Sequence, residues 1–199
     1  IKIFQGIPFA TSEAIKLLNL NKKQIALSCS SHCGQKFHIK ELKNWLEKAK
    51  LKTSDLKCGI HNPIDEQSSV EIFKANLKSS QIHNNCSGKH LAMLSSCLVN
   101  NYPIENYLDF DHPHQDNIRK IFNIFTESKL TKKNYGIDGC SAPQYAFEIK
   151  DLATALKNLY KSYHGNFEFG ENIKVIINSI IANPFFIGGT KNLDSNLMR

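Results

Sequence analysis

Apolar residues recur every three or four positions through most of this chain, and this spacing is what most constrains its fold. Positions three and four apart share one face of a helix, whereas a half-buried strand needs strict alternation. The clearest apolar stripes lie within residues 39–49, 87–100, 113–125, 148–163 and 171–182. The pattern therefore predicts a mostly helical domain.

Signals for helix ends support this prediction. Asn21, followed three residues later by Gln24, has the spacing of a capping box. Pro113 is well placed as the first residue of a helix, where its missing N–H costs nothing. Pro184 ends the last apolar stripe, and a weaker pattern predicts a short helix over residues 68–78.

Strand signals are sparse. The best candidates are two short segments, Lys57–Ile60 and Asn134–Ile137. Thr53–Asp55 has the composition of a turn, and no repeat or linker divides the chain. We therefore expect few strands in this domain.

Composition narrows the class of protein. The chain has 199 residues, of which 41% are hydrophobic and 22% charged, so it can build the core of one domain. No run reaches the roughly 18 consecutive apolar residues that a membrane-spanning helix needs. We therefore predict a globular domain with no membrane partner.

The net charge of +7 comes almost entirely from lysine, since the chain has 23 Lys and only two Arg. Proteins that read nucleic acids rely on the forked arginine guanidinium to bind phosphate and guanine. Codons for Lys, Asn and Ile are rich in A and T, so coding bias alone can produce this basicity. We therefore predict no nucleic-acid partner.

The chain has six cysteines and no CxxC pair, which is too sparse for a disulfide scaffold. Reduced thiols, some buried and some available as metal ligands, are the expected state, and they predict a cytoplasmic protein. The six are Cys29, Cys33, Cys58, Cys86, Cys97 and Cys140.

Three loop-like segments are dense in small, polar and nucleophilic residues: Ser28–Gln35, His83–His90 and Asp138–Pro143. Such residues beside glycine suit close approach of a ligand to the backbone. In the first segment, Ser31 and His32 could be a nucleophile and its base, but neighbouring residues point apart. The alternative is a helix end capped by serine hydroxyls.

The second segment contains Gly88-Lys89, which does not form a phosphate-binding loop, because histidines stand where that motif needs glycine and Ser or Thr. Its Cys86 and Lys89 would share one helix face. The thiolates of Cys86 and Cys140 could hold zinc with a third ligand and water, and a neutral Lys89 nitrogen could be that third ligand. Deprotonating Lys89 costs about 4–5 kcal/mol at pH 7, so His90 or His83 is the cheaper third ligand. Buried structural thiols are the alternative.

Seven motifs in this order extend over the chain: IKIFQGIPF at 1–9, SSHCGQKFH at 30–38, CGIHNP at 58–63, HNNCSGKHLAML at 83–94, HPHQDNI at 112–118, DGCSAP at 138–143, and NPFFIGGT through LM at 183–198. Together they resemble the thermolabile, rhizobial-type L-asparaginase family, the asparaginase II group. The resemblance implies hydrolysis of L-asparagine to L-aspartate and ammonia by an amidohydrolase, with L-asparagine as the small-molecule partner and a homodimer as the expected assembly.

The resemblance also implies an α/β (α+β) fold similar to that of serine β-lactamases and glutaminases, an antiparallel sheet backed by helices. Residues 1–199 would be a single, incomplete asparaginase II domain that is mostly helical, because much of such a sheet is built near the two chain ends. An incomplete sheet would leave apolar helix faces exposed, such as the Ile118–Phe125 stripe.

The family uses two Ser–Lys pairs. Lys2 matches the lysine of an S-x-x-K motif whose serine would precede Ile1. Ser31 matches the second serine, and its lysine would follow Arg199. We therefore expect a fragment that lacks both ends, with a catalytically silent zinc-binding or ligand-binding remnant as the alternative function.

The family's zinc ligands correspond to Cys86, Lys89 and Cys140, so the resemblance implies the unusual lysine ligand and zinc as cofactor. Asp138 matches an acidic neighbour that orients a ligand or the substrate ammonium. His90 is assigned to the substrate site as a supporting residue behind the ligands. Gln35 replaces the family's usual Glu, which either weakens binding or, if that residue only caps a helix, changes nothing.

Overall fold

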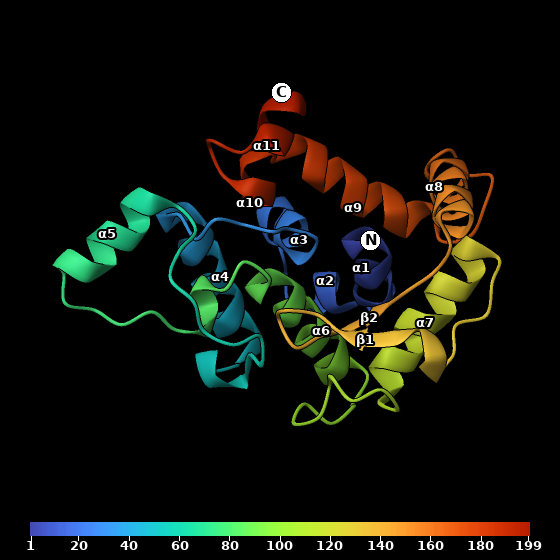
Figure 1. Cartoon of the computed structure of the whole chain (residues 1–199), viewed down its shortest axis with the longest axis horizontal. Helices are drawn as coiled ribbons and strands as arrows, with labels where there is room; N and C mark the ends of the chain where they lie inside the picture. The colour runs from blue at the N-terminus through green and yellow to red at the C-terminus, as the bar shows by residue number, and fades with distance from the viewer.

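The computed structural model describes all 199 residues, in which helices pack around a central helix (Figure 1). The helices are α1 (Lys2–Thr11), α2 (Ala14–Leu17), α3 (Lys22–Ser28), α4 (Lys36–Ala49), α5 (Glu66–Lys74), α6 (Ser87–Val99), α7 (Pro113–Thr126), α8 (Ile149–Tyr163), α9 (Gly170–Ala182), α10 (Phe185–Gly188) and α11 (Leu193–Leu197). Three 3-10 turns are η1 (Thr53–Asp55), η2 (Gln81–His83) and η3 (Lys132–Asn134).

The sheet has two antiparallel strands, β1 (Tyr135–Ile137) and β2 (Pro143–Tyr145). Tyr135 lies opposite Tyr145, and Ile137 lies opposite Pro143. This small sheet among many helices confirms a mostly helical domain with few strands and is compatible with an α/β class.

The predicted helices are present, and their ends form as the sequence indicates. The Asn21 side chain accepts a hydrogen bond from the Gln24 backbone N–H, and the Gln24 side chain accepts one from Asn21, each at 3.0 Å. Pro113 is the first residue of α7. The weak pattern near residue 68 becomes α5, which Asp65 caps at its start.

Of the two predicted strands, the second is β1, but the first is wrong. Residues 57–60 form no strand, because other groups take up their backbone hydrogen bonds. Asn84 Nδ2 donates to the carbonyl of Cys58 at 2.6 Å, and the N–H of Lys57 donates to Tyr107 Oη at 2.9 Å.

Helix α1 is the longest of the helices that periodicity does not predict; the others are the short helices α2, α10 and α11. It lies near the middle of the molecule, packed against α6, α7 and α9, and its residues from Phe4 to Phe9 are all buried (Figure 1). A helix that is buried on every side has no polar face, so its apolar residues show no helical period. Gly6 lets α1 approach α3 closely, because a Cβ there would lie 2.9 Å from Cys29 Sγ.

The apolar stripe of α7 was expected to be exposed, and this expectation is wrong. Ile118, Phe122 and Phe125 are fully buried. The ring of Phe4 in α1 lies 5.8 Å from the Phe122 ring and 5.3 Å from the Phe125 ring. Helix α8 also packs on α7, so the stripe belongs to the core.

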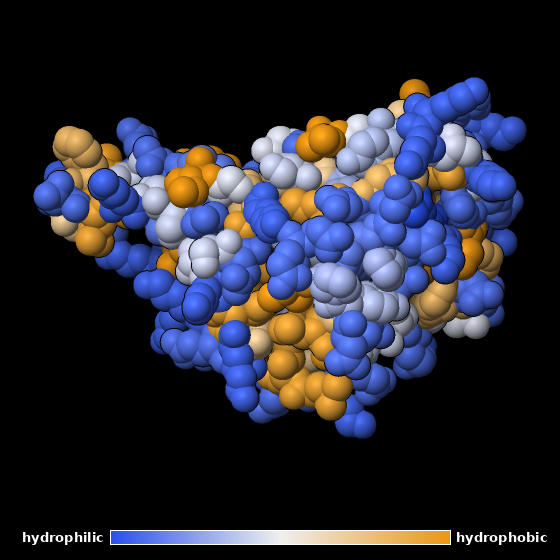
Figure 2. All heavy atoms as spheres, turned by 90° about the horizontal axis from the view of Figure 1, so that it is seen from below, coloured by the Kyte–Doolittle hydropathy of each residue, from blue (hydrophilic) through white to orange (hydrophobic).

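Exposed apolar surface lies elsewhere. Figure 2 shows hydrophobic side chains on the arm at its left edge, where α5 lies, and Phe73 of this helix is 84% exposed. None of the helices combines the length and the apolar character needed to cross a membrane.

Candidate active site

The predicted site residues come from four segments: the start of α1, the loop between α3 and α4, the first turn of α6 and the turn between β1 and β2. Contacts among their side chains bring them together in one cluster, although the segments are far apart in sequence. The cluster consists of Lys2, Ser31, Cys86, Lys89, Asp138 and Cys140.

Lys2 is the link between the serine and the thiols. Its Nζ lies 2.9 Å from Ser31 Oγ and 3.5 Å from Cys86 Sγ, and it also donates to the carbonyl of Ser30. The sequence places these two residues in different Ser–Lys pairs, each missing a member. The structure brings Lys2 and Ser31 together, so the described chain contains a serine hydroxyl beside a lysine nitrogen.

Ser31 is exposed and held in an irregular loop. Its backbone N–H donates to the carbonyl of Ile187 at 3.0 Å. The two preceding serine hydroxyls instead bond to the end of α3: Ser28 Oγ donates to Ile25 at 2.6 Å and Ser30 Oγ to Leu27 at 2.9 Å. The capped helix end is therefore present, but it does not include Ser31.

His32 is not the base for Ser31, because its ring points the other way and is buried. Ser87 Oγ donates to the carbonyl of Ile82, so His32 Nε2 donates to Ser87 Oγ at 2.8 Å, and Nδ1 accepts the Gly34 N–H. Burial, with smaller effects of His38 and Lys2, holds the pKa of His32 well below its ordinary value. This neutral ring ties the Ser31 loop to the start of α6.

Cys86 and Cys140 are free thiols that interact with each other. The hydrogen bond with Cys140 lowers the pKa of Cys86; burial opposes it, and the cations of Lys2 and Lys89 assist it. The same bond, together with burial, raises the pKa of Cys140. Cys86 is therefore the group that takes the thiolate form.

Lys89 lies under these sulfurs and is 2% exposed. Burial works to lower its pKa, but Cys140, Cys86 and Asp138 outweigh burial and raise it. Lys89 Nζ lies 3.5 Å from Asp138 Oδ2, and the Asp138 side chain is 37% exposed. Asp138 thus has one side on the buried ammonium and the other open to solvent.

The conventional metal-binding side chains do not form a site by themselves. No three His, Cys, Asp or Glu side chains meet at a spacing that would hold a metal ion. The predicted set is of another kind, two thiols and a lysine nitrogen, and these three side chains do converge. Zinc therefore stays a prediction that rests on Cys86, Lys89 and Cys140.

His90 lies behind Cys140 and is fully buried. The Lys57 N–H donates to Tyr107 Oη, so the tyrosine proton is directed to His90 Nδ1 at 2.6 Å. Nε2 then carries the ring proton, and it is buried without a hydrogen-bond partner. Burial lowers the pKa of His90, and Cys140 opposes this effect. His90 reaches the site through Cys140.

Sequence reasoning missed Tyr107 and Asn85. Asn85 Nδ2 lies 3.4 Å from Ser31 Oγ, and the Asn85 backbone N–H donates to His61 Nε2 at 3.0 Å. Asn85 lies inside the NNCSGKH motif, so this motif could have identified it as a site residue. Tyr107 carries no motif, and only the packing of the chain reveals its role.

Gln35 joins three segments and does not contact Lys2 or Ser31. Its Nε2 donates to Asp65 Oδ1 at 3.2 Å and to Thr190 Oγ1 at 2.9 Å, and its Oε1 accepts the Thr190 N–H at 3.1 Å. Gln35 also precedes α4 as its N-cap residue. A carboxylate cannot donate to Asp65, so glutamine suits this position by its amide protons.

A serine hydroxyl beside a lysine nitrogen, with an acidic side chain and polar loops around it, is an arrangement that can activate a serine as a nucleophile. The family model of L-asparaginase II matches residues 1–199, and the chain belongs to this family. Membership implies an amidohydrolase and points to L-asparagine as substrate. A search of curated proteins finds no match.

Proposed function

We propose that this protein hydrolyses L-asparagine to L-aspartate and ammonia, with Ser31 as nucleophile and Lys2 as its proton acceptor. The observation that carries the proposal is the 2.9 Å separation between Lys2 Nζ and Ser31 Oγ. Family membership supports the substrate. The complete protein is therefore proposed to be an L-asparaginase.

The first half of the reaction forms an ester. Ser31 Oγ attacks the side-chain amide carbon of asparagine while Lys2, which must first give up its own proton to act as a base, takes the serine proton. The C–N bond then breaks, and the proton from Lys2 goes to the leaving nitrogen, which departs as ammonia. Asn85, whose side-chain amide lies near Ser31 Oγ, is placed to donate to the substrate oxygen.

The second half returns the enzyme to its starting state. Water adds to the ester carbon and gives a proton to Lys2. The bond to Ser31 Oγ then breaks, Lys2 returns the proton to Ser31 Oγ, and L-aspartate is released. Asp138 supports binding in both halves, because its half-exposed carboxylate can pair with the α-ammonium of the substrate. His90 has a supporting role, through Cys140.

Cys86, Lys89 and Cys140 would hold the proposed zinc ion. The fit rests on the two interacting thiols and on the buried Lys89 nitrogen that lies against both. When bound, zinc would supply positive charge that supports substrate binding. Binding requires Lys89 to lose its proton, which is the main cost of this ligand set.

The finer fold, compartment and assembly are proposals too. A serine β-lactamase or glutaminase-like fold is supported by the small antiparallel sheet beside helices. Six free cysteines support a reducing, cytoplasmic compartment. A homodimer and the absence of a nucleic-acid partner stay predictions.

The test is ammonia release from L-asparagine by the full-length protein and by two neighbouring alanine variants. Ser31→Ala should lower kcat by at least about a thousandfold, because it removes the nucleophile. Ser30→Ala is the matched control and should stay within a few-fold, since the Ser30 hydroxyl bonds to α3 and not to Lys2.

Two outcomes would contradict the proposal. If Ser31→Ala keeps its activity, Ser31 is not the nucleophile. If the unaltered protein binds L-asparagine and zinc without turnover, the alternative of a silent binding protein is correct.

A further inference from the structure

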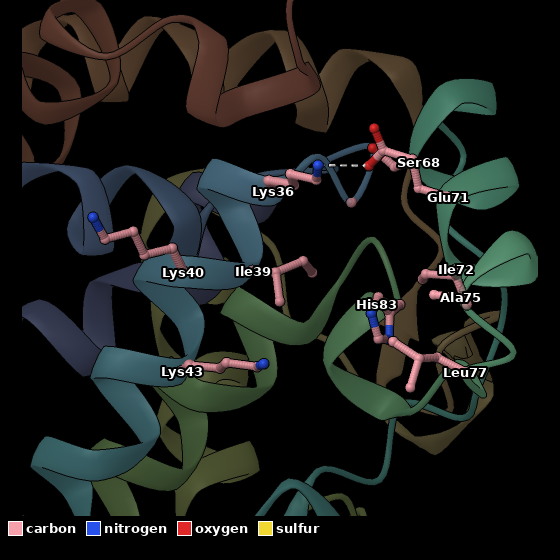
Figure 3. Close-up of a pocket in the computed structure, with 11 residues that line it drawn as sticks. Lys36, Ile39, Lys40, Lys43, Ser68, Glu71, Ile72, Ala75, Leu77 and His83 are labelled. Carbon is pink, nitrogen blue, oxygen red and sulfur yellow. Dashed lines mark ion pairs between the residues drawn. The ribbon is translucent and has the colours of Figure 1, made fainter.

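A groove on the surface lies between α4 and α5, away from the active-site cluster (Figure 3). Its volume is about 660 Å³, and none of the residues proposed for catalysis or zinc binding lines it. The lining residues that matter here are Lys36, Ile39, Lys43, Glu71, Ile72 and His83.

The groove exists because α5 stands apart from the rest of the chain. No residue of α5 is buried, and Figure 1 shows this helix at the edge of the molecule. Ile39 from α4 and Ile72 from α5 face the space between the two helices, with Leu77 at the lower end (Figure 3). Apolar side chains therefore line part of the groove between its charged ends.

The charges of the groove are unequal at its two ends. At one end, Lys36 and Glu71 form an ion pair of 2.9 Å, so the acidic charge is already neutralised (Figure 3). At the other end, the Lys43 side chain points toward His83 and has no carboxylate partner, whereas Lys40 also lines the groove but its ammonium points away from His83 (Figure 3). An unpaired positive charge thus lies inside the groove at one end.

His83 adds a hydrogen-bond donor beside this charge. Its Nδ1 accepts the backbone N–H of Ser80 at 3.0 Å, so the neutral ring carries its proton on Nε2. This Nε2 has no acceptor within the chain. Burial lowers the pKa of His83; the hydrogen bond with Ser80 opposes this effect, and the cation of Lys43 adds a smaller lowering effect.

We propose that this groove binds a small carboxylate with an apolar tail, of the medium-chain fatty acid type. The carboxylate would accept hydrogen bonds from Lys43 Nζ and His83 Nε2, and the tail would lie along Ile39 and Ile72. Ligand pockets of about 300–1,000 Å³ take small molecules, and the groove falls within this range. Because the only acid lining it is paired, no free negative charge opposes such a ligand.

Calorimetric titration of the full-length protein with octanoate tests the proposal, using two lysine variants of one helix. Lys43→Gln should weaken binding by about tenfold, a loss expected when a charged partner is removed. Lys40→Gln removes the same charge from a side chain that points away from His83, and it should leave the affinity unchanged. Both residues are exposed, so neither change threatens the fold.

Two further compounds test the carboxylate and the apolar tail of the ligand separately. Acetate, which has the charge without the tail, and 1-octanol, which has the tail without the charge, should both bind at least about tenfold more weakly than octanoate. An NMR titration should show that octanoate raises the pKa of His83, because the anion favours the charged ring. The Ser31→Ala protein should give the same results, so this test does not depend on catalysis.

Several results would overturn the proposal. The first is that octanoate does not bind. The second is that 1-octanol binds equally well, and the third is that Lys40→Gln and Lys43→Gln weaken binding equally. The fourth is that an acidic peptide binds in place of octanoate. The absence of octanoate binding would mean that the groove takes no small ligand of this type. Equal octanol binding would show a merely apolar surface, equal losses in the two variants would show a general charge effect, and peptide binding would show a protein-docking site.

Discussion

Helices α5 and α6 follow each other in the chain and have opposite relations to solvent. In α6 every residue from Ser87 to Cys97 is buried, although this stretch includes a lysine, a histidine and three serines. In α5 no residue is buried, although Val70 and Phe73 are apolar. Helix α6 thus buries polar side chains, whereas α5 exposes apolar ones.

This difference separates two kinds of functional surface. Buried polar groups are costly unless they are hydrogen-bonded, so their presence in α6 marks a built network. Lys89 pairs with Asp138, His90 bonds to Tyr107, and Ser95 accepts the Trp45 indole N–H. Exposed apolar side chains of α5 make no such network, and they suit the binding of a molecule from outside.

The largest effect on stability is expected at Gly88, inside α6. A Cβ there would lie 2.2 Å from the carbonyl oxygen of Leu27, which is closer than atoms can approach. Gly88→Ala should therefore lower the free energy of unfolding by about 3 kcal/mol or more. Urea denaturation measures this, with Gly136→Ala as control, since a Cβ at Gly136 meets nothing within 4 Å. Equal stability of the two variants would show that α3 and α6 do not pack this closely.

A second, smaller effect is expected at His114, a polar side chain buried in α7 without partners. Neither ring nitrogen has a hydrogen bond, and burial, with a smaller effect of His112, lowers its pKa to about 3. In the unfolded chain the pKa is near its ordinary value of 6.5. With respect to this group, the protein is most stable above pH 6.5 and loses stability as the pH falls toward 3, because only the unfolded chain takes up the proton.

Replacing His114 removes this pH dependence. Between pH 7 and pH 5, His114→Leu should lose about 2 kcal/mol less stability than the unaltered protein. It should also be at least as stable at pH 7, since two unpaired buried atoms disappear. Urea denaturation at both pH values measures this, and His164→Gln, at an exposed position, should show no difference. An unchanged slope in His114→Leu would mean that the histidine is bonded or solvated.

The smallest effect is expected at Phe73 in α5, which is 84% exposed. Phe73→Ser should change the free energy of unfolding by less than about 0.5 kcal/mol, because no buried contact is lost. The corresponding change in α6, Leu91→Ala, should cost about 2–5 kcal/mol, since Leu91 is fully buried. Thermal melts compare the pair, and a large loss in Phe73→Ser would show that α5 is covered in solution.

Most of the fold was predictable where helices have one apolar and one polar face. The stripe of α4 and the proline at the start of α7 predict their helices directly. Helix α1 was not predicted because it is buried on all sides. The strand predicted over residues 57–60 is absent because side chains take up the backbone hydrogen bonds of this segment. Both cases depend on tertiary packing, which local pattern does not record.

The site was predictable as a list of residues but not as an arrangement. Motif matches single out Lys2, Ser31 and the thiols, yet they assign Lys2 and Ser31 to separate pairs. Their contact depends on where α1 lies against the loop after α3, and this follows from packing. Tyr107 behind His90 was not predictable, because a lone tyrosine carries no pattern.

The loop that holds Ser31 is fixed by the far end of the chain. Ser31 bonds to Ile187, and Gln35 bonds to Thr190 across 155 residues. Contacts of such long sequence separation form late, because closing a long loop costs entropy before any contact forms. During synthesis, Lys2 and Ser31 emerge early, but the loop cannot be fixed until the ribosome has passed Thr190. The proposed nucleophile is therefore among the last parts of the molecule to be set in place.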